Sequence, residues 1–300
     1  MLGNRRLAAI IDEAAQANAK LILVGDPKQL PEIDPGGLFK SLAERLGHHE
    51  LTNNRRQRDP VERQAAADIR LGDAPAAVDR LVDHGRIVTA DNADQLRERM
   101  IADWYQVYAS GQSVLLTASR RSAVADLNHR ARQTLTTHGH LGPTALTVDG
   151  TDYAVGDQLM TLRNNRRLGL TNGQIGVVSD ADDQGGLLMR LADGATKQIP
   201  ADYITAGHIA HGYASTIHKA QGATVDQAFI LADDTLSQES GYTALTRGRA
   251  ANRVYLVRPE IGEHDRSVDD PLDLLKHSLS RSAAKTAAID RLGPAPTIDI

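Results

Sequence analysis

The chain has 300 residues, of which 41% are hydrophobic and 24% charged, with a formal net charge of −4 and no cysteine. This balance is that of a globular chain with one large domain or two ordinary ones, and the lack of cysteine excludes disulfides and thiolate metal sites. The acidic balance excludes a global basic footprint for nucleic acid, so any DNA contact must come from local cations and backbone amides. No apolar run approaches the roughly 18 residues that a membrane span needs, and we expect a cytoplasmic protein.

The first part of the chain has the helix, strand and loop order of an α/β fold. Residues 5–19 carry apolar side chains at helical spacing, and 21–24 is a short apolar run that predicts a buried parallel strand. A polar loop at 25–31 follows this run, and a short helix is expected at 38–46. Ligands of such folds bind outside the carboxyl ends of the strands, so this loop is a candidate site.

The α/β pattern continues over the middle of the chain and returns near its end. A helix can begin at Pro60, and the following expected elements are a helix at 94–109, a strand at 114–118 and a helix over about 121–133. Beyond residue 211 we expect strands at 229–231 and 254–257, a helix at 242–249 between them, and a helix at 271–280 in a polar tail.

Residues 143–203 have a different pattern. Short alternating runs occur at 158–162, 175–178 and 187–191, and turn signals such as Asn172-Gly173 separate them. We expect a small antiparallel barrel or meander that is inserted in the α/β domain.

The loop Gly25-Asp26-Pro27-Lys28-Gln29-Leu30-Pro31 is the first of four polar segments that carry candidate chemistry. Asp26 could orient a water or an amide near phosphates, and Gln29 could sense a terminal phosphate and relay its presence to a DNA track. The alternative is a proline-bracketed turn. The position directly after an apolar run favours the functional interpretation.

The second segment, Asn54-Arg55-Arg56-Gln57, offers two guanidinium groups. Arginine presents a rigid fork of donors that suits phosphate oxygens. Alone, the pair would be interpreted as a solvated surface feature. Its position after an α/β unit favours Arg56 as a phosphate contact.

The third segment, at 216–222, has the sequence Thr-Ile-His-Lys-Ala-Gln-Gly and can line a groove. Thr216, His218, Lys219 and Gln221 offer groups for sequence-independent contacts to a DNA backbone, and Gly222 permits close approach of the main chain. His208, His211 and His218 lack compact ligand spacing, so we assign no metal site.

The fourth segment, at 242–249, ends in Thr246-Arg247-Gly248-Arg249. An arginine across a cleft can neutralise charge on a transferred phosphoryl group, an effect worth ~10³–10⁵ in rate. The alternative is a cation placed favourably at a helix end, worth ~0.3–1 kcal/mol. The surrounding sequence favours the phosphate role for Arg247.

Two features argue against a complete nucleotide site in these residues. Asp12 and Glu13 lie in Ala-rich sequence with helical spacing, so we interpret them as an exposed helix face rather than a magnesium-binding pair. The dipeptide Gly-Lys never occurs, so the Walker A loop that cradles the β- and γ-phosphates is missing.

In order and wording, the four segments resemble motifs III to VI of superfamily 1B, RecD-like DNA helicases. The likeness is closest to the helicase region of conjugative relaxase-helicases of the TraI/TrwC (MobF) kind, and it covers roughly residues 1–258. It implies a P-loop NTPase (RecA-like) α/β fold with four parts. These are a remnant of the first RecA-like domain at 1–57, a complete second one at 58–148 and 207–261, an SH3-like β insertion at 149–206 and a helical tail at 262–300.

The resemblance also implies functional residues, a cofactor and partners. ATP with Mg²⁺ would drive 5′-to-3′ movement on single-stranded DNA, and an upstream half or partner would supply Walker A, Walker B and the relaxase domain. The alternatives are a non-catalytic single-stranded-DNA-binding module and a degenerate remnant that is poorly soluble. The implied catalytic residues are Gln29, Arg56 and Arg247, the ATP-binding residues Gly25, Asp26, Gln29, Arg56, Gly222 and Arg247, and the DNA-binding residues Thr117, Ser119, Asn172, Thr216, His218, Lys219 and Gln221.

Overall fold

The computed structural model describes residues 2–31, 36–51, 54–258, 270–285, 287 and 290. Residues 52 and 53, which directly precede the second polar segment, lie outside this part of the chain, as does much of the expected tail. Among the helices within it, none is long and apolar enough to cross a membrane.

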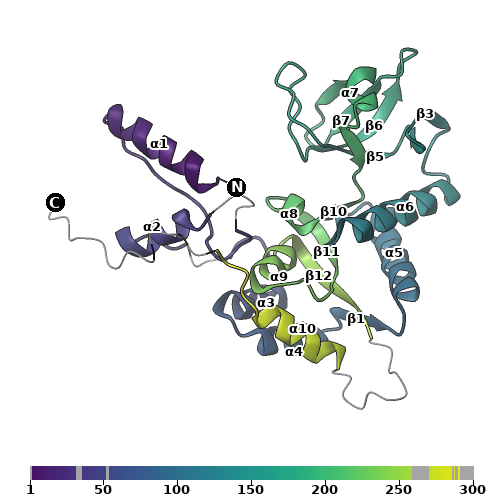
Figure 1. The fold of residues 1–300 in the computed structure, drawn as a ribbon. Coiled ribbons are helices and arrows are strands. Elements are labelled where there is room, and N and C mark those ends of the chain that lie inside the picture. Colours follow the sequence, from purple (N-terminus) through teal and green to yellow (C-terminus); the bar gives the residue numbers. More distant parts are fainter. Residues whose placement is uncertain are drawn as a thin grey trace.

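A parallel sheet of five strands forms the centre of the molecule (Figure 1), in the order β1-β12-β11-β2-β10. Every neighbouring pair in this order is parallel, so each connection must cross over the sheet. The strand bounds are Ile87–Ala90 for β1, Val114–Ala118 for β2, Ala214–Thr216 for β10, Val225–Leu231 for β11 and Gly248–Val257 for β12.

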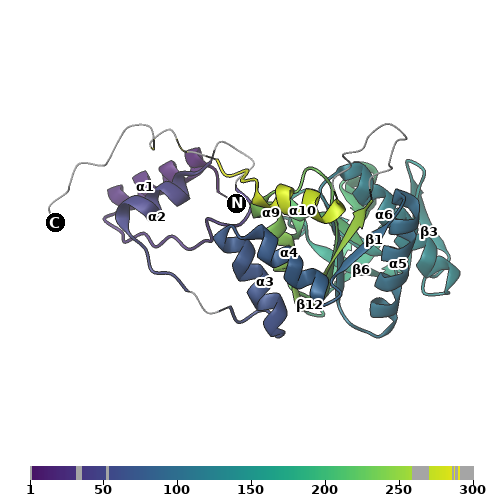
Figure 2. The same ribbon diagram turned by 90° about the horizontal axis from the view of Figure 1, so that it is seen from below.

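Helices cover both faces of this sheet, as the burial of its central strand requires. On β11, Ala228 and Ile230 pack into one hydrophobic core, whereas Phe229 and Leu231 pack into the other. Figure 2 shows the two helical layers on opposite sides of the strands. One layer contains α3 (Pro60–Leu71), α4 (Ala74–Asp83), α9 (Gln238–Leu245) and α10 (Pro271–Ser280). The other layer contains α5 (Ala93–Ala109) and α6 (Arg121–Thr137). The one-turn helix α8 (Ile217–Ala220) follows β10.

An antiparallel sheet in the order β8-β7-β6-β5-β9 lies between α6 and β10 in the chain. Its core is separate from the two cores of the parallel sheet and contains Leu159, Val178 and Met189. The elements of this region are β3 (Thr144–Val148), β4 (Thr151–Ala154), β5 (Gln158–Thr161), β6 (Ile175–Ala181), β7 (Leu187–Leu191), β8 (Thr196–Ile199), α7 (Ala201–Thr205) and β9 (Ile209–His211). The expected antiparallel meander is therefore confirmed, while the domain boundaries given above stay a prediction.

The N-terminal segment contributes two helices, α1 (Asn4–Gln16) and α2 (Leu38–Leu46), which lie apart from the sheet, beyond α3 and α9 (Figure 2). Asp12 and Glu13 are exposed on α1, as expected. The predicted strand at 21–24 is wrong, because this run is irregular and Ile22 and Val24 are 71% and 91% exposed. Its main chain pairs with no neighbouring strand in the described residues, and a parallel strand has no stability without one.

The predicted helix at 242–249 is wrong in its bounds. Helix α9 begins earlier, where Ser237 and Ser240 form a capping box, and it ends at Leu245. Arg247 follows the helix and Arg249 lies in β12. Helix α4 and strand β1 were not expected from the sequence, whereas the expected bounds of α2 and α10 are confirmed.

Candidate functional site

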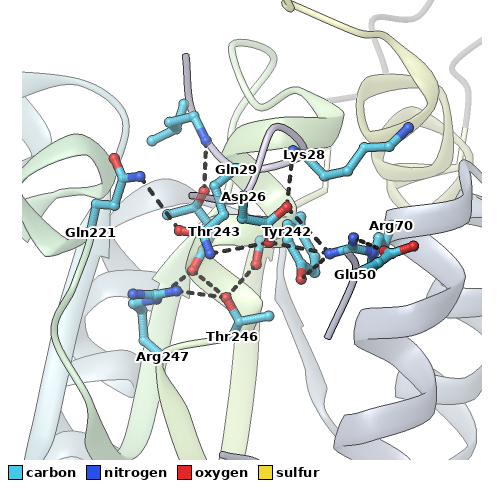
Figure 3. Close-up of polar contacts among 11 residues, drawn as sticks. Asp26, Lys28, Gln29, Glu50, Arg70, Gln221, Tyr242, Thr243, Thr246 and Arg247 are labelled. Atoms are coloured by element: carbon cyan, nitrogen blue, oxygen red, sulfur yellow. Dashed lines mark hydrogen bonds and ion pairs between the residues drawn. The ribbon is translucent and has the colours of Figure 1, made fainter. Parts of the chain in front are cut away.

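The loop at 25–31 is held against helix α9 by side-chain contacts (Figure 3). The backbone N–H of Leu30 donates to Thr243 Oγ1 at 3.0 Å, and this hydroxyl belongs to a fully buried residue. Within the loop, Asp26 accepts from the Lys28 N–H at 3.1 Å and from Gln29 Nε2 at 3.3 Å. The structure therefore brings the first and fourth polar segments together.

Two arginines of the second and fourth segments meet at Thr246. Arg56 Nη1 donates to the Thr246 carbonyl at 3.0 Å, and Arg247 Nη2 donates to Thr246 Oγ1 at 2.8 Å. Arg247 also donates to the carbonyls of Thr243 at 2.7 Å and Ala223 at 3.3 Å. All these partners are neutral, and neither guanidinium forms a salt bridge with a carboxylate in the described residues.

The charge on Arg247 is buried at a cost. The residue is 1% exposed, and burial, together with the nearby Arg56, lowers the pKa of its guanidinium to about 10. A buried cation beside a like charge, with only neutral acceptors, favours an anion in the adjoining space.

Two pockets adjoin the loop at 25–31, and Asp26 and Gln29 line both. The smaller, about 290 Å³, contains Arg56, and the larger, about 470 Å³, contains Gly25 and Gly222. Of the residues expected to bind ATP, the structure therefore gathers all but Arg247 around these two pockets. Arg247 reaches the smaller one through Thr246, which lines its wall.

The third segment begins at the carboxyl end of β10 and contacts the first. Thr216 caps α8 by accepting from the Lys219 N–H at 3.4 Å, and His218 and Lys219 are exposed. Although both side chains reach the surface, nearby protein atoms remove part of their hydration. This desolvation, and then the charge of Lys285, lowers the pKa of His218, and desolvation, and then the charge of Arg121, lowers the pKa of Lys219. Gln221 Nε2 donates to Gln29 Oε1 at 3.4 Å.

The other residues expected to bind DNA have different surroundings. Thr117 is fully buried in β2 and its hydroxyl donates to the Phe229 carbonyl at 3.2 Å, so its side chain is not available for DNA. Ser119 follows β2, whose end lies beside the end of β10, and its buried hydroxyl has no partner in the described residues. Asn172 is exposed in the loop between β5 and β6 of the antiparallel sheet.

Sequence reasoning missed two sets of polar side chains. Arg70 contacts Asp26 in the loop at 25–31, and no pattern in the sequence marks it. Tyr242 and Thr243 belong to the fourth segment, but nothing in that segment predicts their contacts with Arg70 and with Leu30. Arg163, Arg166 and Arg167 surround a pocket of about 620 Å³ beside α7. The run Arg163-Asn164-Asn165-Arg166-Arg167 was a readable signal for the second set. No group of three metal-ligating side chains occurs within the described ranges.

The chain is similar to several known proteins. Residues 1–92 match a family described as an AAA domain. The conjugal transfer protein TraA of Rhizobium radiobacter is 36% identical over 260 residues, which cover 85% of this chain and 24% of TraA. The RecBCD enzyme subunit RecD of Mycolicibacterium smegmatis is 31% identical over 271 residues, or 83% of this chain and 47% of RecD. The chain thus spans about a quarter of TraA and about half of RecD.

A solved structure shares the fold. A crystal structure of Pif1 helicase from Bacteroides, in complex with ADP-AlF3 and ssDNA, matches 85% of this chain and 63% of its own with a TM-score of 0.52 and 17% identity. The α/β fold with its parallel sheet accordingly resembles that of the Pif1 helicase. Over most of its length the chain is thus similar to TraA and to RecD, and the expected resemblance to RecD-like helicases of superfamily 1B is confirmed.

Proposed function

We propose that this chain is the C-terminal portion of an ATP-dependent 5′-to-3′ DNA helicase or translocase of conjugative DNA transfer or recombination-repair. The observation that carries the proposal is the pair Arg56 and Arg247, which share Thr246 and have no carboxylate partner in the described residues. Residues 1–57 would be the remnant of a first RecA-like domain and 149–206 an SH3-like insertion.

In this proposal the two arginines bind the terminal phosphate of a nucleotide. Both guanidinium groups offer donors in a fixed geometry, and their hydrogen bonds to Thr246 hold them in place before the ligand arrives. Gln29 lines the same pocket as Arg56 and contacts Gln221, so it would couple the nucleotide to the DNA track. Gly25, Asp26 and Gly222 would complete the wall.

The residues present fit phosphate oxygens but not Mg²⁺. Asp12 and Glu13 are exposed on α1, away from any strand end, and the 300 residues contain no Gly-Lys dipeptide. ATP hydrolysis by this chain alone is therefore not expected, and an upstream half or partner would supply Walker A and Walker B.

Single-stranded DNA would follow the exposed side chains of the third segment. Lys219 and His218 are exposed beside Thr216 and Gln221, and Ser119 lies at the neighbouring strand end. Asn172, with the arginines around the pocket beside α7, would extend the contact onto the insertion. The Pif1 helicase of shared fold was crystallised with ssDNA, which supports this choice of ligand.

The second candidate is a module that binds single-stranded DNA without nucleotide turnover. The missing Gly-Lys dipeptide favours this candidate, because the chain then has no Walker A loop to bind the β- and γ-phosphates of a nucleotide. A degenerate remnant is the third candidate. Its support is the exposure of Ile22, Val24, Leu46 and Leu51 at 71% to 94%, since such apolar surface promotes aggregation.

The deciding measurement is binding of a fluorescent oligo-dT to the 300-residue chain at several salt concentrations, with ATP turnover followed in the same samples. We expect salt-sensitive binding and no turnover. Lys219→Ala should weaken binding and reduce the slope of log affinity against log salt by about 0.7. Lys276→Ala is the matched control, because that lysine pairs with Asp79 on the α4–α10 surface. Aggregation without DNA binding would favour the degenerate remnant. ATP turnover by this chain alone would contradict the inference that it needs Walker A and Walker B from elsewhere.

The proposed phosphate site can be tested separately by substitution of the neighbouring arginines Arg55 and Arg56. Both arginines line the smaller pocket, but Arg56 donates to the Thr246 carbonyl, whereas the Arg55 side chain is exposed. Arg56→Gln should lower the affinity for tripolyphosphate, measured by equilibrium dialysis, by about tenfold or more, as expected for loss of a charge-assisted contact. Arg55→Gln should change it less than twofold if Arg56 is the contact. Equal effects of the two substitutions would show only diffuse charge attraction.

A further inference from the structure

Arg70, in the last turn of α3, contacts three segments that are far apart in the sequence (Figure 3). Its Nη1 donates to both carboxylate oxygens of Asp26 at 3.2 Å and to the Tyr242 hydroxyl at 3.3 Å. Its Nη2 contacts the carboxylate of Glu50. The guanidinium of Arg70 therefore joins three parts of the chain: the loop at 25–31, Glu50 shortly before the second polar segment, and helix α9.

An exposed ion pair would be the plain interpretation, since a cation is also favourable at a helix C-terminus. The contacts of Arg70 are more extensive than those of an exposed ion pair. The side chains of Arg70 and Asp26 are only 29% and 21% exposed, and two carboxylates and a hydroxyl converge on one side chain. Lysine could not reproduce this arrangement, because its ammonium is a point charge without a planar fork.

The carboxylate that Arg70 holds is the first member of a polar chain. Asp26 accepts from Gln29 Nε2 at 3.3 Å, and Gln29 Oε1 accepts from Gln221 Nε2 at 3.4 Å. The Lys28 N–H also donates to Asp26, at 3.1 Å. Rotation of the Asp26 carboxylate would therefore move Gln29 and release the turn at Lys28.

We propose that Arg70 is a positioning residue that fixes Asp26 and thereby holds Gln29 in contact with Gln221. The purpose of this positioning rests on the proposed function, in which Gln29 couples the nucleotide site to the DNA track. The geometric part stands separately: Arg70 latches the loop at 25–31 onto α3 and α9. A change at Arg70 should alter communication between the sites without removing any DNA contact.

Hydrogen exchange of the 300-residue chain tests the latch without DNA. In Arg70→Gln, exchange of the amides at Lys28, Gln29 and Leu30 should accelerate about tenfold or more, whereas helix α3 keeps its protection. Arg70→Lys should behave like Arg70→Gln. Arg80→Gln is the control, because Arg80 pairs with Asp68 away from the loop, and should leave it unchanged. Unchanged loop exchange in Arg70→Gln, or equal loss of protection in α3, would overturn the proposal.

A second arm adds oligo-dT and tests the coupling. In the wild type, DNA should slow exchange at 25–31 through Gln221 and Gln29. In Arg70→Gln this slowing should be lost, while oligo-dT affinity stays within twofold because Arg70 lies outside the proposed track. DNA-induced protection that survives in the variant would refute the coupling role. Absence of DNA binding in the wild type would refute the proposed function, and the first arm would still decide the latch.

Discussion

Leu30 and Thr243, which are 213 residues apart, are joined by a hydrogen bond from the Leu30 N–H to Thr243 Oγ1 at 3.0 Å. Thr243 is fully buried and Leu30 is 8% exposed, so water cannot replace this contact. The bond fixes one end of the loop at 25–31 to α9, while Arg70 and Asp26 fix the other.

Replacing Thr243 with valine should therefore release the loop. Valine keeps the shape but leaves the Leu30 N–H buried without a partner, which costs about 1–3 kcal/mol. We expect the free energy of unfolding in urea to fall by that amount and exchange at Leu30 to accelerate. Thr243→Ser keeps the hydroxyl and should retain most of the stability; an equal loss in both variants would assign the effect to the missing methyl group instead.

The burial of Arg247 predicts a pH effect on stability. Its pKa is about 10 in the folded chain, below the ordinary value of an arginine, so the unfolded chain binds more protons between these two values. Stability from this group must therefore increase as pH rises through that window. Replacing Arg247 with methionine removes the buried charge and should abolish this increase.

At neutral pH, Arg247→Met should leave the melting temperature unchanged or raise it, because an apolar side chain avoids the desolvation of a buried cation. Its affinity for tripolyphosphate should nevertheless fall. Thermal unfolding at pH 7.5 and 11 checks the first expectation, with Arg55→Met as the exposed control. A strongly lowered melting temperature at pH 7.5 would make Arg247 a structural residue.

Gly241, inside α9, should not tolerate alanine. Alanine is ordinarily the better helix former by about 1 kcal/mol. Here an added Cβ would overlap Leu279 Cδ2 of α10, and such overpacking costs about 1–3 kcal/mol. We expect Gly241→Ala to lower the free energy of unfolding. The double variant with Leu279→Ala should lose less than the sum of the two single effects, and simple additivity would contradict the packing argument.

Asp157 joins the antiparallel sheet to the parallel one. It is fully buried and accepts from Tyr213 at 2.5 Å, from the Ala154 N–H at 2.7 Å and from Arg132 at 3.1 Å. Removing its charge would leave Arg132 uncompensated, so Asp157→Asn should cost about 3–5 kcal/mol in the free energy of unfolding. Asp183→Asn, at an exposed position, is the control and should cost less than about 0.5 kcal/mol.

The same carboxylate predicts acid sensitivity. Burial opposes its ionisation, but the nearby His211 imidazole and hydrogen bonds from Tyr213 and the Ala154 N–H outweigh burial and hold the pKa of Asp157 below its ordinary value. Its contribution is therefore complete above the unfolded pKa of about 3.9 and is lost as pH falls through the lower folded value. The stabilities of wild type and Asp157→Asn should converge in that acid range, and a constant difference would exclude the linkage.

The amino-acid sequence by itself determined the local elements. Pro271 and the capping residue Asp270 define the start of α10, and Asp59 caps α3 through the Val61 N–H. The apolar run at 114–118 became β2 because two neighbouring strands lie beside it. These signals act within a few residues, so they are visible without knowledge of the fold.

The tertiary structure decided what those elements contact. The run at 21–24 has the same apolar character as β2 but stays irregular, since no strand beside it satisfies its main chain in the described residues. Thr117 is buried in the sheet. Arg70, which no motif marks, and Thr243, whose contact the fourth segment does not predict, hold the loop at 25–31. Burial and hydrogen-bond partners depend on segments some 40 to 210 residues away in the chain, and no local pattern records them.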